Sequence, residues 1–148
     1  MISVTVCHRF EYAHRLPNHT GKCSNLHGHS GKVEVTAIAQ AGPLTEPGMV
    51  LDFGHLKTIV RRIIDVRLDH STILNTNDPL YEFLKGWGNL QLKLVKFWGE
   101  PTAENLAIEI HKLISEDVLL KGFTLIVKFW EGPNSCATFA PASPNDRC

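Results

Sequence analysis

Two long stretches of alternating residues constrain the fold of this chain more than any other feature. In residues 2–14 apolar side chains and histidines recur at every second position, and residues 29–40 alternate in the same way. A period of two is typical of β-strands that bury one face and expose the other. We expect the two strands to pair antiparallel, joined by the loop 15–26.

Two other segments repeat their apolar residues with the period of a helix. Asp52 is the expected N-cap of a helix that runs to about residue 66, and Thr102 precedes a second helix in the same way. The apolar stripes consist of Phe53, Leu56, Ile59, Val60, Ile63 and Ile64 in the first helix and Leu106, Ile110, Leu113 and Ile114 in the second.

The last third of the chain alternates again. Strands are expected at 123–131 and 135–140, on either side of the turn Gly132-Pro133-Asn134. Residues 76–100 are harder to assign, although 90–98 can add an edge strand. The order ββααββ indicates an α+β fold, in which an antiparallel sheet carries two helices on one face.

The composition fits a single domain over residues 1–148. Hydrophobic residues make up 43% of the chain and charged residues 20%, which permits a packed core. The 15 Lys and Arg residues balance 15 Asp and Glu residues, so no basic excess favours nucleic acid or a membrane surface as a partner. The first residues resemble no targeting peptide. We therefore expect a cytoplasmic protein with four free thiols.

Histidines form the most informative cluster. Because alternate residues of a strand point the same way, the HxH of His27 and His29 can direct two imidazoles at one ion. His14 ends the first strand on its apolar side, so the hairpin should bring all three together. Three imidazoles suit zinc and leave a fourth position open, as in catalytic sites. The alternative is three unconnected histidines near loops.

Cys23, Asp69, His70 and Glu131 are further candidates. Cys23 is either a fourth ligand, which would close the site, or a thiol acidified by the nearby cation. Asp69 can orient His70 and support its cationic form, although adjacent Asp-His pairs are usually structural. Glu131 ends an apolar strand, where its carboxylate is either exposed or lies at the floor of a pocket.

Five motifs in order resemble the 6-pyruvoyl-tetrahydropterin synthase family, in particular its 6-carboxy-tetrahydropterin synthase branch of the queuosine pathway. The motifs are YAHRLP with His14, CSNLHGH from Cys23 to His29, LDH at 68–70, PTAEN at 101–105 and KFWEG with Glu131. The resemblance covers about residues 3–139. It implies the tunnelling fold (T-fold), in which subunits join their sheets into a barrel, commonly as homohexamers with active sites between subunits.

The resemblance also implies a role for each candidate. The three histidines would hold zinc, and Cys23 would be the thiolate that removes a proton, with Asp69 and His70 as acid–base partners. Glu131 would bind the pterin ring, and Thr102 is a weaker candidate for the same pocket. The implied reaction converts 7,8-dihydroneopterin triphosphate into 6-carboxy-tetrahydropterin, acetaldehyde and triphosphate.

Two alternative functions stay open, and two further residues are candidates for substrate binding. The pyruvoyl branch acts on the same substrate and gives a different product, whereas a closed site of one cysteine and three histidines would belong to a non-catalytic zinc- or pterin-binding protein. Arg15 and Lys22 are candidates for contact with the triphosphate.

Overall fold

The computed structural model describes residues 2–39, 48–88 and 91–142. Along these residues the elements are β1 (Ser3–His14), a 3-10 helix η1 (Lys22–Ser24), β2 (His27–Ala39), α1 (Phe53–Arg67), β3 (Ser71–Asn75), α2 (Pro79–Gly86), β4 (Leu94–Phe97), α3 (Ala103–Ser115), a 3-10 helix η2 (Val118–Leu120), β5 (Phe123–Gly132) and β6 (Ser135–Phe139). None of the described helices is long and apolar enough to cross a membrane.

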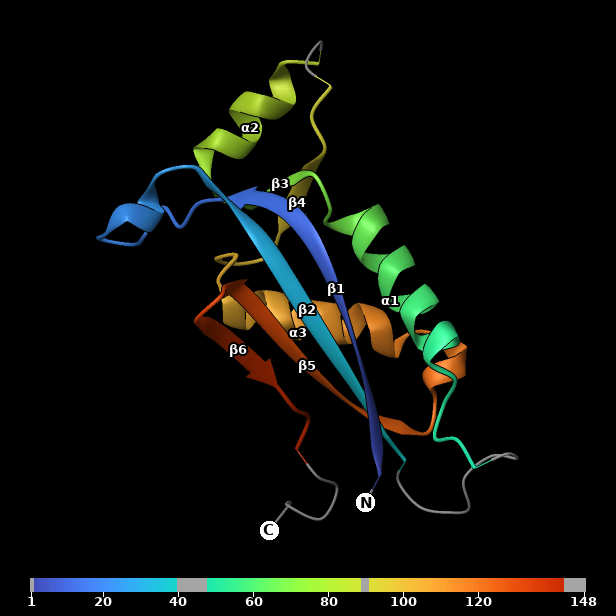
Figure 1. Cartoon of the computed structure of the whole chain (residues 1–148). Coiled ribbons are helices and arrows are strands. Elements are labelled where there is room, and N and C mark those ends of the chain that lie inside the picture. The colour runs from blue at the N-terminus through green and yellow to red at the C-terminus, as the bar shows by residue number, and fades with distance from the viewer. Residues whose placement is uncertain (1, 40–47, 89–90, 143–148) are drawn as a thin grey trace.

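The strands form one sheet in the order β4-β3-β1-β2-β5-β6, which curls around the helices (Figure 1). β1 and β2 pair antiparallel from Ser3 opposite Ile38 to His14 opposite His27, which confirms the expected hairpin. β5 pairs antiparallel with β2, and β6 with β5. Gln40 and Leu90, the outermost residues of two expected strands, lie outside the described residues.

The expectation of a wholly antiparallel sheet with two helices in the order ββααββ is wrong in detail. β3 lies parallel to β1, and β4 lies parallel to β3. The chain passes from β2 through α1 to β3, which runs opposite to β2 and hence parallel to β1. It then passes from β3 through α2 to β4, and this crossover brings the chain back in the direction of β3. The sheet is therefore mixed, and the order of elements is ββαβαβαββ.

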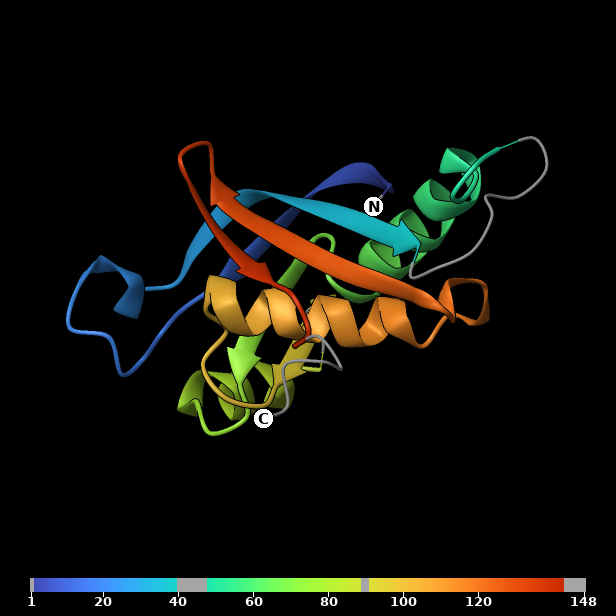
Figure 2. The ribbon, with the colours of Figure 1, turned by 90° about the horizontal axis from the view of Figure 1, so that it is seen from below.

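The helices α1 and α3 nevertheless form the expected layer on one face of the sheet (Figure 2). α1 packs on β1, and α3 packs on β5 and β6. Asp52 accepts hydrogen bonds from the first backbone N–H groups of α1, and Thr102 caps α3, as the sequence predicts. The core between the layers includes Val6, Phe10, Val33, Val127 and Phe129 from the strands and Leu56, Val60, Leu106 and Ile110 from the helices.

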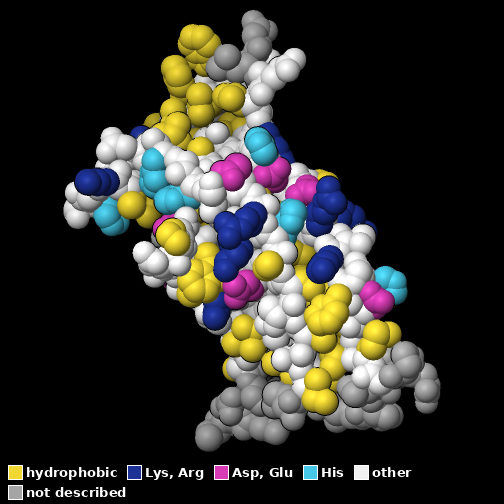
Figure 3. Space-filling view, viewed as in Figure 1, with side chains coloured by type: hydrophobic (Ala, Val, Ile, Leu, Met, Phe, Trp, Pro, Cys, Tyr) yellow, Lys and Arg dark blue, Asp and Glu magenta, His cyan; other side chains and the backbone are white. Residues whose placement is uncertain are grey.

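The helix α2 was not expected, and it lies beyond the end of the helix layer, beside β3 and β4. Phe83 and Trp87 of this helix are exposed, and apolar side chains cover this end of the molecule in Figure 3. The edge strand β4 falls inside the expected 90–98 segment. The described residues between 76 and 100 thus build an extension of the sheet next to the end where β1 finishes.

Candidate active site

Three imidazole rings meet at the end of the β1–β2 hairpin. His14 lies opposite His27, and His29 lies opposite Tyr12, so alternation turns all three rings toward the helix-covered face. The ring centroids are 4.7 to 5.0 Å apart. One nitrogen from each ring lies within 4.8 Å of the other two. The expected convergence is therefore present, and the cluster can hold a metal ion.

Backbone carbonyls fix the orientation of two of these rings. His14 Nδ1 donates to the carbonyl of Pro101 at 2.7 Å, and His27 Nδ1 donates to that of Asn25 at 2.7 Å. Because these bonds occupy Nδ1, the lone pair is left on Nε2, which is the usual arrangement of metal-bound histidine. The Nε2 atoms of His14 and His29 are buried, and neither has a hydrogen-bond partner among the described residues. A metal ion would satisfy both.

The surroundings of His14 and His29 favour the uncharged form that binds metals. Burial lowers the pKa of His14 and outweighs the bond to Pro101 and the charge of Glu131, which raise it; His27 and His29 lower it slightly further. Burial also lowers the pKa of His29 and outweighs the charge of Glu131, which raises it; His27 adds a smaller lowering contribution. Since metal binding requires neutral imidazole, both shifts favour a metal at neutral pH.

Glu131 and Tyr12 border the histidine cluster. The Glu131 carboxylate lies 3.5 Å from His14 Nε2, and the hydroxyl of Tyr12 approaches the same oxygen at 3.5 Å. Tyr12 is buried; its ring stacks on His29 and meets His14 edge-on. Burial, followed by the charge of Glu131, raises the pKa of Tyr12, so its phenol stays a neutral donor. The sequence left two interpretations of Glu131, an exposed carboxylate or one at the floor of a pocket. Its position beside the unpartnered histidine nitrogens favours the second interpretation.

Sequence reasoning missed Tyr12, because it was counted as one more apolar position of an alternating strand. Its position two residues before His14 on the same face could have identified it. Gly31 makes room for the ring, since a Cβ at Gly31 would come within 3.0 Å of Tyr12 Cε1.

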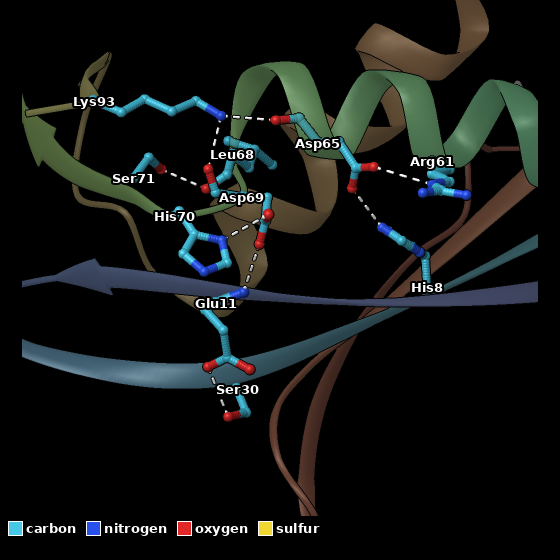
Figure 4. Close-up of polar contacts among 10 residues, drawn as sticks. All are labelled: His8, Glu11, Ser30, Arg61, Asp65, Leu68, Asp69, His70, Ser71 and Lys93. Atoms are coloured by element: carbon cyan, nitrogen blue, oxygen red, sulfur yellow. Dashed lines mark hydrogen bonds and ion pairs between the residues drawn. The ribbon is translucent and has the colours of Figure 1, made fainter.

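Asp69 and His70 form a hydrogen-bonded pair at the turn between α1 and β3 (Figure 4). Asp69 Oδ2 accepts from His70 Nδ1 at 2.7 Å, and Oδ1 accepts from the Glu11 backbone N–H at 2.9 Å. The backbone N–H of His70 donates to the Glu11 carbonyl at 2.6 Å. Burial would raise the pKa of Asp69, but the hydrogen bonds from Glu11 and His70 outweigh it and lower that pKa. The pair is thus an ionised carboxylate beside an exposed imidazole.

Cys23 lies in η1 and is only partly buried. Its carbonyl accepts from the N–H of Leu16, beyond the end of β1. Among the described residues, the group of converging ligand atoms contains the three histidines without Cys23. His70 is tied instead to Glu11, three residues before His14, which corresponds to about 10 Å of strand. Within one chain Cys23 and His70 are therefore anchored at different places.

Two other candidates serve the structure locally. The guanidinium of Arg15 makes two bonds to the carboxylate of Asp78, at 2.7 and 2.6 Å, and Asp78 in turn caps α2. This pair uses two of the five N–H groups of the guanidinium, so contact of Arg15 with a triphosphate stays a prediction. Thr102 accepts from the N–H of Asn105 as the cap of α3, next to the Pro101 carbonyl that orients His14. Its role in substrate binding, like that of Lys22, stays a prediction.

The curled sheet, its helix layer and the histidine cluster together define a T-fold protein whose site can hold a metal ion. Two solved structures share this fold. An uncharacterized protein from Wolinella succinogenes superposes with a TM-score of 0.75 at 25% identity, over 96% of this chain and 100% of the other. A catalytic-residue mutant of 6-pyruvoyltetrahydropterin synthase from Plasmodium vivax gives 0.71 at 23% identity, over 93% and 96%.

The chain belongs to the 6-pyruvoyl tetrahydropterin synthase family, whose sequence pattern matches residues 3–142. A 6-carboxy-5,6,7,8-tetrahydropterin synthase of Aquifex aeolicus is 38% identical over 127 residues, which cover 80% of this chain and 75% of that protein. The enzyme of the same name from Rickettsia bellii is 33% identical over 137 residues, which cover 90% and 96%. The family resemblance found in the sequence is thereby confirmed.

Proposed function

We propose that this protein is a zinc-dependent lyase that converts 7,8-dihydroneopterin triphosphate and one water molecule into 6-carboxy-5,6,7,8-tetrahydropterin, acetaldehyde and triphosphate. The proposal rests most directly on the three imidazoles whose free nitrogens converge beside Glu131. It is supported by relatives of 33 to 38% identity that carry the 6-carboxy-tetrahydropterin synthase name. We further propose that the chain is one cytoplasmic domain that acts in queuosine biosynthesis.

In this proposal the chain provides a metal site, a binding site for the pterin ring and groups that transfer protons. Zinc bound by the histidines would act as a Lewis acid toward the side-chain oxygens of the substrate. Glu131 accepts hydrogen bonds from the pterin ring, and Thr102 lines the same pocket. Cys23 removes a proton, and His70, oriented by Asp69, supplies one while triphosphate leaves.

We propose that neighbouring copies of the chain complete each active site. The separate anchoring of Cys23 and His70 supports this arrangement, because proton transfer needs both groups within hydrogen-bond reach of one substrate. A homohexamer in which one subunit contributes Cys23 and its neighbour contributes Asp69 and His70 meets that requirement.

Two rival functions make different predictions. The pyruvoyl activity has the same site and substrate, and only the product separates it from the proposed reaction. A non-catalytic zinc protein would need Cys23 as a fourth ligand, which the converging group of three histidines does not favour.

The first test supplies the zinc-loaded protein with 7,8-dihydroneopterin triphosphate and identifies the products by mass spectrometry. The proposed function predicts 6-carboxy-tetrahydropterin and acetaldehyde, whereas 6-pyruvoyl-tetrahydropterin would assign the sister activity. Cys23→Ala is the matched variant, since a proton-abstracting thiolate can be removed without loss of zinc. Loss of both zinc and stability in Cys23→Ala would instead identify a structural ligand.

A further inference from the structure

Lys93 connects the extension built by residues 76–100 to the turn that carries Asp69 and His70. It lies just before β4, and its carbonyl accepts from the N–H of Thr72 at 2.9 Å. Its side chain crosses to the end of α1, where Nζ donates to the carbonyl of Asp69 at 2.7 Å and to that of Asp65 at 2.8 Å (Figure 4). One ammonium group thus links the last turn of α1, at Asp65, to the turn that follows it, at Asp69.

This turn needs external support for two reasons. The Asp65 carbonyl belongs to the last turn of α1, where carbonyls lack partners within the helix. His70 has a φ of 51°, a left-handed conformation that is uncommon for a residue with a side chain and that surrounding contacts must maintain. Lys93 supplies a charged donor at both places, and a cation at a helix C-terminus is favourable.

The side-chain carboxylates of Asp65 and Asp69 already have other partners, so Lys93 contacts only the backbone carbonyls of these two residues. The carboxylate of Asp65 is already held by His8 at 2.7 Å and by Arg61 at 3.2 Å. The carboxylate of Asp69 is held by Glu11 and His70. Lys93 therefore acts on the path of the backbone from Asp65 to His70, and the direction of the imidazole follows from that path.

We infer that Lys93 is a positioning residue for the Asp69–His70 pair. The inference rests on the proposed function, in which His70 donates a proton, and it assigns a role to the added segment of the sheet. Lys93 itself touches no reacting atom. Its effect falls on kcat, because a misplaced proton donor slows the chemical step while the pterin and metal contacts at the histidine cluster remain.

The experiment compares Lys93→Met, which keeps the aliphatic stem without the ammonium, with Lys93→Arg, which can still donate to both carbonyls. Asp52→Ala is the matched control, because it removes a cap at the opposite end of the same helix. For each protein we would measure thermal stability, bound zinc, and kcat and KM. We would also record the nitrogen-15 signals of the His70 ring without substrate, assigned with His70→Gln. The bond to Asp69 holds the proton on Nδ1.

The expected result for Lys93→Met is a loss of kcat of roughly tenfold to a hundredfold with little change in KM. His70 should move from the Nδ1–H form toward a mixture of tautomers. Lys93→Arg should recover most of kcat, and Asp52→Ala should lose stability alone. If Lys93→Met does not fold, Lys93→Gln takes its place; because its shorter side chain keeps a neutral donor, the same changes should appear with smaller size.

A Lys93→Met protein that loses stability like Asp52→Ala but keeps its kcat and the His70 tautomer would overturn the inference and leave Lys93 as a helix cap. Absence of turnover in the wild-type protein would reject the proposed function separately. In that case the His70 signals decide the role of Lys93, because an unchanged tautomer in Lys93→Met contradicts positioning.

Discussion

The histidine cluster and the Asp69–His70 turn are held in place by different means. The cluster stands on two paired strands of twelve and thirteen residues, and His14 is 1% exposed. The turn lies at a helix end, and the side chain of His70 is 77% exposed. Strand register fixes the proposed metal ligands, whereas individual polar contacts from Glu11 and Lys93 hold the turn. The two halves of the proposed chemistry should therefore respond differently to substitution.

The largest effect is expected at the metal ligands. His29→Ala removes one of three nitrogens and should lower zinc affinity by more than about 100-fold, since even outer partners of ligands contribute 10- to 100-fold. Metal analysis and competition with a chelating dye measure this loss. His19→Ala, at an exposed loop histidine bonded to the N–H of Gly21, is the control and should bind zinc normally. Equal zinc affinity in the two variants would exclude the cluster as the metal site.

The next effect concerns the turn and its proposed partner subunit. His70→Ala should lose about 10²- to 10⁴-fold in kcat, the usual contribution of a general acid, while it keeps its zinc. Cys23→Ala should behave alike. Subunits of the two inactive variants, mixed and reassembled, should regain about a quarter of wild-type activity if each site draws on two neighbours. No recovery in demonstrably mixed oligomers would contradict the shared site.

Tyr12→Phe should have a smaller effect. It removes the donor to Glu131 and leaves the ring contacts with His14 and His29 unchanged. The loss of one hydrogen bond, about 0.5–1.5 kcal/mol, corresponds to a rise in KM of roughly twofold to tenfold. Zinc content and thermal stability should stay near the wild-type values. Steady-state kinetics checks the expectation, and a variant with unchanged KM would show that Glu131 needs no help from the phenol.

The smallest expected effect is on the pH dependence of stability, to which the histidine cluster and the Asp69–His70 turn contribute at different pH. Burial lowers the pKa of His14 and His29, so the unfolded metal-free chain takes up protons before the folded one. Stability should therefore fall as the pH drops below about 6.5, the ordinary histidine value. The lowered pKa of Asp69 acts only below about 3.9, the ordinary aspartate value, where the lowered pKa values of Asp65 and Asp78 act as well. Urea unfolding of the metal-free protein from pH 8 to pH 3 should resolve both declines, and His29→Gln should weaken only the first.

The sequence predicts the hairpin and the histidine cluster because both depend on alternation, which local residues reveal. β3 could not be predicted in this way, because its five residues are almost all buried and show no alternation. The helix α2 has eight residues, too few for a clear stripe. The partner of Arg15 is 63 residues away in the chain, so no local pattern could distinguish a structural arginine from one that meets phosphate.

The ring of Tyr12 lies over Gly31 and fills the space that a side chain at position 31 would need. A Cβ at position 31 would come within 3.0 Å of the ring, so Tyr12 would have to shift, and a larger residue there favours a smaller one at position 12. Such an exchange would take away the ring that stacks on His29 and meets His14 edge-on. It also removes the hydroxyl from Glu131, so a substitution made for packing alone would alter the hydrogen bonding of the pocket.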